Sequence, residues 1–229
     1  MISVIIPTLN AETGLAAALS ALVPAAIDGL VREVIIVDGG STDRTLQIAH
    51  GMGADIVSAR RGRGHQLAAG AAQARCSWFL FLHADTVLET GWEREASAFM
   101  ERVDAGERPP AAAAFSFALD DLGFLPRVVE AGVGLRCTFF RLPYGDQGLL
   151  IPRRLYEEIG GHRKMPIMED VALVGQLGRA RTIILRTRAV TSAIRYRRDG
   201  YVRRVLRNQL CLTLYFLNVP PHRIARIYG

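Results

Sequence analysis

Short apolar runs alternate with helical stretches along the first third of the chain, and this alternation constrains the fold more than any other feature. The strand-like runs fall at residues 2–7, 33–38, 55–59 and 77–83. Stretches with helical spacing of leucine and alanine separate them, at residues 11–23, 41–50 and 64–75. Strands that alternate with helices over short connections predict an α/β fold with a mostly parallel sheet and helices on both faces.

After residue 85 the pattern is less regular. Strands are expected at residues 111–119, 148–151, 181–185 and 189–195, and helices at 89–103, 123–140, 153–159, 169–177 and 201–218. Pro220 and Pro221 are expected to stop the last helix. No internal repeat or low-complexity linker divides the 229 residues, so a single domain is expected.

Charge and cysteine content indicate the kind of partner and the cellular compartment to expect. The formal net charge of +6 implies attraction to an acidic partner, such as a diphosphate, a nucleic acid or an anionic membrane. Three separated cysteines without a CxxC pair favour a reduced compartment. Neither a secretory leader nor an apolar run long enough to span a bilayer is evident, so a cytoplasmic protein is expected.

Polar residues follow each early strand, at the edge of a parallel sheet where ligands bind. The four segments are residues 7–10, 38–43, 60–64 and 83–85. Asp38, before two glycines, suits a ribose or a base edge, whereas Asn10 could simply cap the next helix. Arg63 and Gly64 at a helix start could belong to a phosphate cradle or to a tight turn.

Two further acidic segments also allow a functional and a structural interpretation. Asp85, two residues after His83, suits Mg²⁺ or Mn²⁺, which prefer oxygen ligands and share them with phosphates, but this segment could instead cap a helix or form a buried hydrogen-bonded pair. Glu169 and Asp170 open a late helix, where a carboxylate can act as a general base or simply stabilise the helix dipole. Spacing alone does not choose between these alternatives.

Taken in order, the segments resemble the family 2 glycosyltransferases of the GT-A fold. The matching stretches begin at Ser3 (SVIIPTLNAE), Glu33 (EVIIVDGGSTDRT), Arg60 (RRGRGHQLAAGAAQA), Trp78 (WFLFLHADT), Tyr144 (YGDQGLLIPRRLYEEIGGH) and Met168 (MEDVALVGQL). They cover roughly residues 1–178, and several ordered motifs are more specific than any single one. The ending resembles a compact bacterial subgroup, the radical-SAM/selenodomain-associated transferases.

The resemblance implies a role for each matching residue. The residues expected to bind the nucleotide sugar are Pro7, Thr8, Asn10, Glu12, Asp38, Arg63, Gly64 and Asp85. Asp85 would also hold the metal, with His83 a further candidate ligand where many members have an Asp. Asp170 would be the general base of an inverting transfer, with Glu169 beside it. Asp146, Gln147 and Gly148 would contact the donor sugar and the acceptor.

The resemblance also implies an organisation and a set of partners. Within the single domain 1–229, residues 1–105 would bind the nucleotide sugar, residues 106–200 would form the acceptor and catalytic half, and 201–229 the C-terminal helix and tail. The expected cofactor is Mg²⁺ or Mn²⁺. The expected partners are a UDP-linked sugar donor and an acceptor that is either a lipid or a small molecule.

Several other classes of protein are alternatives to a transferase. A nucleotidyltransferase or an NAD-dependent dehydrogenase would need a glycine-rich loop after the first strand, which residues 8–12 do not provide. A catalytically silent nucleotide-sugar binder or membrane-surface scaffold remains an alternative, although the presence of Asp38, Asp85, Glu169 and Asp170 argues against it. No motif supports nucleic-acid binding. The arginines of the last third form either a solvated face or, with the apolar residues 210–217, a peripheral contact with the inner membrane face.

Overall fold

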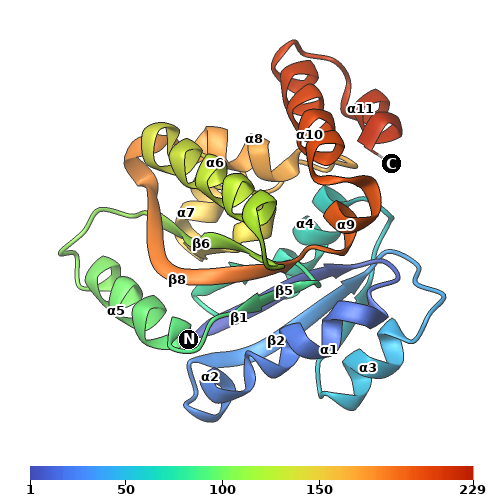
Figure 1. The fold of residues 1–229 in the computed structure, drawn as a ribbon. Helices are drawn as coiled ribbons and strands as arrows, with labels where there is room; N and C mark the ends of the chain where they lie inside the picture. The colour runs from blue at the N-terminus through green and yellow to red at the C-terminus, as the bar shows by residue number, and fades with distance from the viewer. Residues whose placement is uncertain (229) are drawn as a thin grey trace.

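The computed structural model describes residues 1–228, and its strands form one eight-stranded sheet (Figure 1). The strands are β1 (Ile2–Thr8), β2 (Val31–Asp38), β3 (Asp55–Ser58), β4 (Trp78–Phe81), β5 (Thr86–Leu88), β6 (Ala112–Asp120), β7 (Leu149–Pro152) and β8 (Thr182–Ser192). Their order across the sheet is β3-β2-β1-β4-β7-β6-β8-β5. β1 to β4 run parallel and β6 is parallel to β8, whereas β7 and β5 are antiparallel to their neighbours. The predicted α/β fold with a mostly parallel sheet is confirmed.

Helices cover both faces of this sheet. They are α1 (Glu12–Ser20), α2 (Val23–Ile27), α3 (Thr45–Gly51), α4 (Arg63–Gln73), α5 (Trp92–Asp104), α6 (Phe124–Phe140), α7 (Arg153–Glu158), α8 (Glu169–Leu177), α9 (Ile194–Asp199), α10 (Tyr201–Phe216) and α11 (Pro221–Tyr228). The helices α1, α2, α3 and α5 pack on one face, and α4, α7 and α8 pack on the other. Of residues 1–228, no helix has both the length and the apolar composition needed to cross a bilayer.

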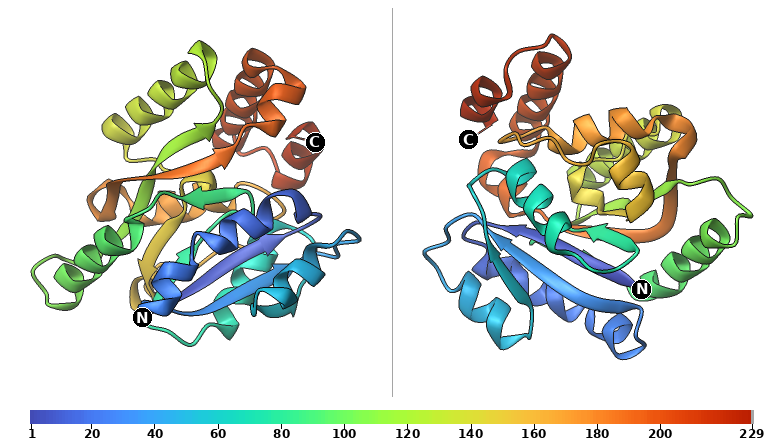
Figure 2. Two further views of the ribbon diagram at one scale, coloured as in Figure 1. Left: turned by 60° about the horizontal axis from the view of Figure 1, so that its bottom comes forward. Right: turned by 180° about the vertical axis from the view of Figure 1, so that it is seen from behind.

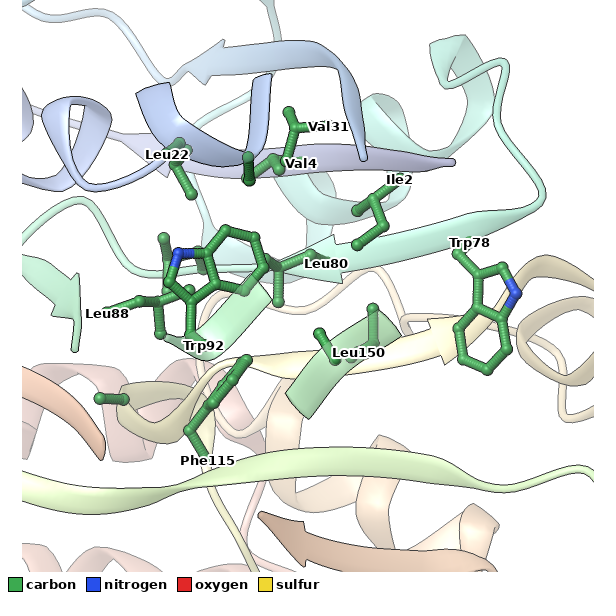
Figure 3. Packing of buried hydrophobic residues seen from close by; sticks show 14 of the residues in the cluster. Ile2, Val4, Leu22, Val31, Trp78, Leu80, Leu88, Trp92, Phe115 and Leu150 are labelled. Atoms are coloured by element: carbon green, nitrogen blue, oxygen red, sulfur yellow. The ribbon is translucent and has the colours of Figure 1, made fainter. Parts of the chain in front are cut away.

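The alternation of side chains along β1 explains why most of this strand is apolar. Ile2, Val4 and Ile6 belong to the core beneath α1 and α5, whereas Ile5 belongs to the opposite core beneath α4. A strand buried on both faces reads as a continuous apolar run. In the first core Trp92 packs with its neighbours around β4 and β6 (Figure 3).

Three features after residue 85 differ from the sequence predictions. The expected strands 181–185 and 189–195 are one continuous strand, β8, and the end of the second is the start of α9. β5 was missed because three residues give too short a periodicity to recognise. The helix expected at 201–218 ends at Phe216, ahead of Pro220 and Pro221 as predicted, but the further helix α11 was missed; it begins at Pro221, since proline is tolerated in the first turn of a helix.

Gly70 lets α4 approach the sheet closely. A Cβ atom built on Gly70 would lie 2.5 Å from Cγ2 of Ile5 and 2.7 Å from Cγ2 of Val37, both on buried strands. Side chains of β-branched residues in a packed sheet have little freedom to move aside. The glycine therefore sets the distance between α4 and the strand ends that α4 faces.

We expect Gly70→Ala to lower the free energy of unfolding by about 1–3 kcal/mol, because the methyl group overpacks the core. Gly175→Ala on α8 is the matched control, since a Cβ there meets nothing within 4 Å. Urea unfolding of both variants checks the prediction. Equal stability of the two would show that α4 is not held at van der Waals contact with β1.

Candidate active site

The loops after β1 and β2 are joined by their own side chains. Oδ1 of Asn10 accepts a hydrogen bond from the Thr42 amide at 2.9 Å, and the Asn10 amide donates to Oγ of Ser41 at 2.9 Å. Glu12 accepts from the Arg44 amide at 3.1 Å. Asn10 has a φ of 50°, in the left-handed region that asparagine tolerates better than most residues. These two predicted binding residues therefore shape the rim of the sheet.

Asp38 lies at the end of β2, beside Thr8 at the end of β1. Its carboxylate accepts hydrogen bonds from the amides of Gly40 and Ser41, at 2.8 and 2.9 Å, and from the hydroxyls of Ser41 and Thr8. Burial raises the pKa of this carboxyl, but these hydrogen bonds outweigh burial and lower it, so Asp38 stays ionised. Asp38 orders the loop that any nucleoside at this edge would meet.

Gly64, the second residue of α4, packs against residues 163–166. The amide of Gly64 donates to the carbonyl oxygen of Met165 at 3.1 Å, and a Cβ on Gly64 would lie 2.2 Å from the carbonyl oxygen of Arg163. Because this amide is already engaged, it is not free to bind a phosphate. The geometry therefore favours a packing role for Gly64 over a phosphate cradle.

Arg63, at the first turn of α4, connects two other parts of the chain. Its Nε lies 3.0 Å from Oε1 of Glu169, and its Nη1 lies 3.3 Å from Nε2 of His83. Burial alone would lower the pKa of Arg63, but the carboxylates of Glu169 and Asp170 raise it above its ordinary value. Arg63 is therefore a permanent positive charge between the end of β4 and the start of α8.

His83 and Asp85 form a hydrogen-bonded pair directly after β4. Nδ1 of His83 contacts Oδ1 of Asp85, so both ring nitrogens of His83 are engaged by protein groups. The Asp85 side chain is 26% exposed. Within residues 1–228, no cluster of three or more His, Cys, Asp or Glu side chains could hold a metal alone. A cation at Asp85 would thus depend on oxygen atoms from a ligand, as Mg²⁺ commonly does with phosphates.

Glu169 is buried at the start of α8, with 2% of the residue exposed. Oε1 faces Arg63, while Oε2 is buried without a hydrogen-bond partner among residues 1–228. Burial raises the pKa of this carboxyl to about 7, even though Arg63 acts in the opposite direction. Glu169 can therefore carry a proton near neutral pH.

Asp170 is held by backbone amides from two segments. Oδ2 accepts a hydrogen bond from the Gly145 amide at 2.7 Å, and Oδ1 accepts from the Val171 amide at 2.8 Å. A Cβ on Gly145 would lie 3.2 Å from Oδ2 of Asp170, so the glycine permits this close approach. Asp170 thereby joins the loop before β7 to the start of α8.

Two hollows meet at Asp170. The first, which we call the inner pocket, is narrow, with a volume of about 40 Å³, and its walls include Pro7, Arg63, His83, Tyr144, Glu169 and Asp170. The second, the outer cavity, has a volume of about 510 Å³ and lies between α6, α8 and α10. Arg63, Tyr144 and Asp170 line both. Thr8, Asn10, Glu12, Asp38 and Asp85 are not among the lining residues of either.

The segment of Asp146, Gln147 and Gly148 serves partly as framework. Gln147 is buried and donates from Nε2 to the carbonyl oxygen of Phe115 at 2.8 Å. Gly148, with a φ of 64°, lines the inner pocket, whereas Asp146 and Gln147 line the outer cavity. Sequence reasoning missed the aromatic and basic residues around the outer cavity, which have no motif of their own; they include Arg136, Tyr196 and Tyr228.

The fold is that of the GT-A glycosyltransferases, and solved structures of this class superpose on nearly the whole chain. Glucosyl-3-phosphoglycerate synthase from Mycobacterium tuberculosis in complex with Mn²⁺ and UDP-glucose covers 92% of this chain and 78% of its own, with a TM-score of 0.61 and 21% identity. TarS residues 1–349 from S. aureus covers 99% of this chain and 69% of its own, with a TM-score of 0.62 and 16% identity.

Sequence comparisons concern the N-terminal half. Residues 3–106 match the sequence model described as Glycosyl transferase family 2. The PGL/p-HBAD biosynthesis glycosyltransferase of Mycobacterium bovis (strain BCG / Pasteur 1173P2) is 37% identical over 101 residues, 38% of this chain and 36% of that protein. The glucosyl-3-phosphoglycerate synthase of M. tuberculosis (strain ATCC 25618 / H37Rv) is 34% identical over 95 residues, 38% of this chain and 29% of that protein. The matches span about a third of these relatives.

The raised pKa of Glu169 predicts a pH-dependent effect of Glu169→Gln. With a folded pKa of about 7 against an ordinary value of 4.5, the folded state holds more protons than the unfolded state between these pH values. This group therefore makes the protein less stable as pH rises from about 4.5 to 7. We expect the melting temperature of Glu169→Gln, relative to wild type, to be higher at pH 8 than at pH 5. Glu107→Gln, on an exposed loop, should show no such trend; a flat difference for both variants would contradict the burial effect.

Proposed function

We propose that the chain is a glycosyltransferase that moves a sugar from a nucleoside diphosphate sugar to an acceptor hydroxyl. The observation that carries the proposal is the position of Asp170, which lines both the inner pocket and the outer cavity. A general base must lie within hydrogen-bond reach of the acceptor hydroxyl, and that hydroxyl must stand next to the donor, so the boundary between two binding spaces is a suitable position for the base. The match of residues 3–106 and the activities named for the relatives support the same class.

The donor is proposed to bind along the rim formed by the ends of β1, β2 and β4. Pro7 and His83 lead from this rim into the inner pocket, and the loops ordered by Asn10, Glu12 and Asp38 flank it. UDP is proposed as the nucleotide, because the related synthase is described in complex with UDP-glucose.

Asp85 is proposed to hold a Mg²⁺ or Mn²⁺ ion together with oxygen atoms of the diphosphate. Such an ion would neutralise the charge that develops on the leaving group. His83 is proposed to orient Asp85, since Nδ1 faces that carboxylate and Nε2 faces Arg63. Arg63 adds a permanent positive charge at the same place.

The transfer is proposed as a single inverting displacement. The acceptor oxygen forms a bond to the anomeric carbon, the bond from that carbon to the diphosphate oxygen breaks, and the nucleoside diphosphate leaves with the bonding electrons. The proton of the acceptor hydroxyl passes to the carboxylate of Asp170. The amides of Gly145 and Val171 keep this carboxylate in place.

We expect Asp170→Asn to reduce turnover by about 10²–10⁴-fold, the range that a general base contributes, while donor binding is retained. UDP release from UDP-sugars in the presence of Mn²⁺ measures turnover with water as acceptor, and the nucleotide-dependent rise in melting temperature measures binding. Asp28→Asn, on the exposed end of α2, is the control and should behave as wild type. Full UDP release by Asp170→Asn would remove the assignment of the base.

We expect Asp85→Asn to abolish the additional stabilisation that Mn²⁺ gives to the UDP complex. A ligand at 100 times its Kd stabilises a folded protein by about 2.7 kcal/mol, which a thermal-shift measurement resolves. Asp170→Asn serves as the matched control, because it alters a carboxylate of the same site without a proposed metal contact. An unchanged metal effect in Asp85→Asn would place the cation elsewhere, and a wild-type protein indifferent to every nucleotide sugar would overturn the transferase proposal.

A further inference from the structure

Helix α6 presents an apolar face away from the core. Only Pro126 and Cys137 of its 17 residues are buried. Its exposed side chains are large and apolar, with Phe124 79%, Val128 50%, Leu135 59%, Phe139 61% and Phe140 58% exposed. Phe124, Val128, Leu135 and Phe139 are spaced by four and seven residues and so lie on one side of the helix.

Helix α10 has a similar face. Val202, Leu206 and Leu210 are spaced by four residues and are 66%, 64% and 49% exposed, and Phe216 and Leu217 at the helix end are 63% and 69% exposed. Figures 1 and 2 show α6 and α10 projecting on the same side of the molecule, away from β1 and β2. Exposed apolar areas of this extent on a single face mark an interaction site. We call the exposed side chains of the two helices the apolar face.

The net positive charge of the protein is concentrated next to this face. Residues 193–228 contain eight arginines and one acidic residue, Asp199, which leaves 20 basic and 21 acidic residues for the remainder of the chain. Asp199 pairs with Arg198, Arg204 and Arg207 together. Arg203 is exposed on α10, directly after Val202 of the apolar face, and forms no ion pair within residues 1–228.

The outer cavity opens beside the apolar face. Val128 of α6 lines the cavity and is also half exposed, so the cavity reaches the surface there. Its walls from α6 and α10 combine apolar residues, among them Val129, Val133 and Leu212, with the polar Arg136, Asn208 and Gln209. Asp170, Arg63 and Asp146 line the same cavity.

We propose that the apolar face docks on an anionic membrane surface and that the outer cavity receives the hydroxyl-bearing head of a lipid acceptor. The inference rests on the proposed transferase function, whose acceptor site it specifies. Apolar side chains that insert at the lipid interface, beside guanidinium groups that attract anionic headgroups, are the two components of peripheral membrane binding. A cavity with both apolar and polar walls that opens beside such a surface and is lined by Asp170 suits a substrate with an apolar tail and a polar head.

Vesicle flotation tests the docking without any transferase assay. Wild-type protein is mixed with vesicles of phosphatidylcholine alone, or of phosphatidylcholine with phosphatidylglycerol, at low and high salt. We expect at least tenfold tighter binding to the anionic vesicles, weakened by salt, because each arginine near the surface contributes about fivefold. The double variant Leu135→Glu with Phe139→Glu should lose about tenfold or more in affinity, and Arg203→Glu should lose several-fold. Ile27→Glu is the matched control, because Ile27 is 79% exposed on α2, outside the apolar face.

The outcomes separate this inference from the proposed function. Absence of binding to anionic vesicles, or equal binding by all the variants, would overturn the membrane inference. Light scattering provides a second measurement: a wild-type dimer that the double variant converts to a monomer, with no vesicle binding, would assign the apolar face to a second copy instead. The thermal shift of each variant with UDP and Mn²⁺ verifies folding. If this shift persists without vesicle binding, only the membrane inference fails; if wild type shows no shift, the transferase proposal fails.

Discussion

The site depends on one partly buried cation, Arg63. Its guanidinium faces Glu169 on α8 and His83 after β4, so a single side chain joins the parallel part of the sheet to the helix that carries Asp170. Separating this pair is costly, because the buried carboxylate of Glu169 would be left as an unpaired charge. Glu169 can also become neutral, because its raised pKa allows it to take up a proton. The contact between Arg63 and Glu169 therefore fixes the geometry of the site.

The sequence predicted the parallel half of the fold because its signals there are local. The strands around Ile5 and Val37 are apolar on both faces, and Gly70 permits the intervening helix to pack on them. Each of these properties can be read from neighbouring residues. The later elements depend on longer-range pairing: β8 continues past residues 185–187, where the ladder is irregular, because it pairs with β6 on both sides of this irregularity. β5 exists only because β8 extends that far.

The candidate site likewise has residues that the sequence reveals and contacts that only the folded structure reveals. Asp85, Glu169 and Asp170 could be singled out as candidate site residues from their positions at element ends and from the family resemblance. The partner of Glu169 could not be predicted, because its contact with Arg63 joins residues more than a hundred positions apart. Oε2 of Glu169 has no hydrogen-bond partner among residues 1–228, and this too is a consequence of tertiary burial. The outer cavity has no sequence signal at all, since it is assembled from α6, α8, α10 and α11.

The two sides of Asp170 also differ in what they can bind. Toward the sheet the pocket is narrow, and Arg63, His83 and Glu169 bring charge to walls that are otherwise mainly apolar. Toward α6 and α10 the cavity is larger, and its walls combine apolar side chains with polar ones such as Arg136, Asn208 and Gln209, so it can enclose part of a larger ligand. In the proposed transfer, a ligand that fills the outer cavity would exclude water from Asp170 on that side. The lining of the outer cavity would then contribute to the choice of acceptor, because what fills the cavity decides which hydroxyl reaches Asp170.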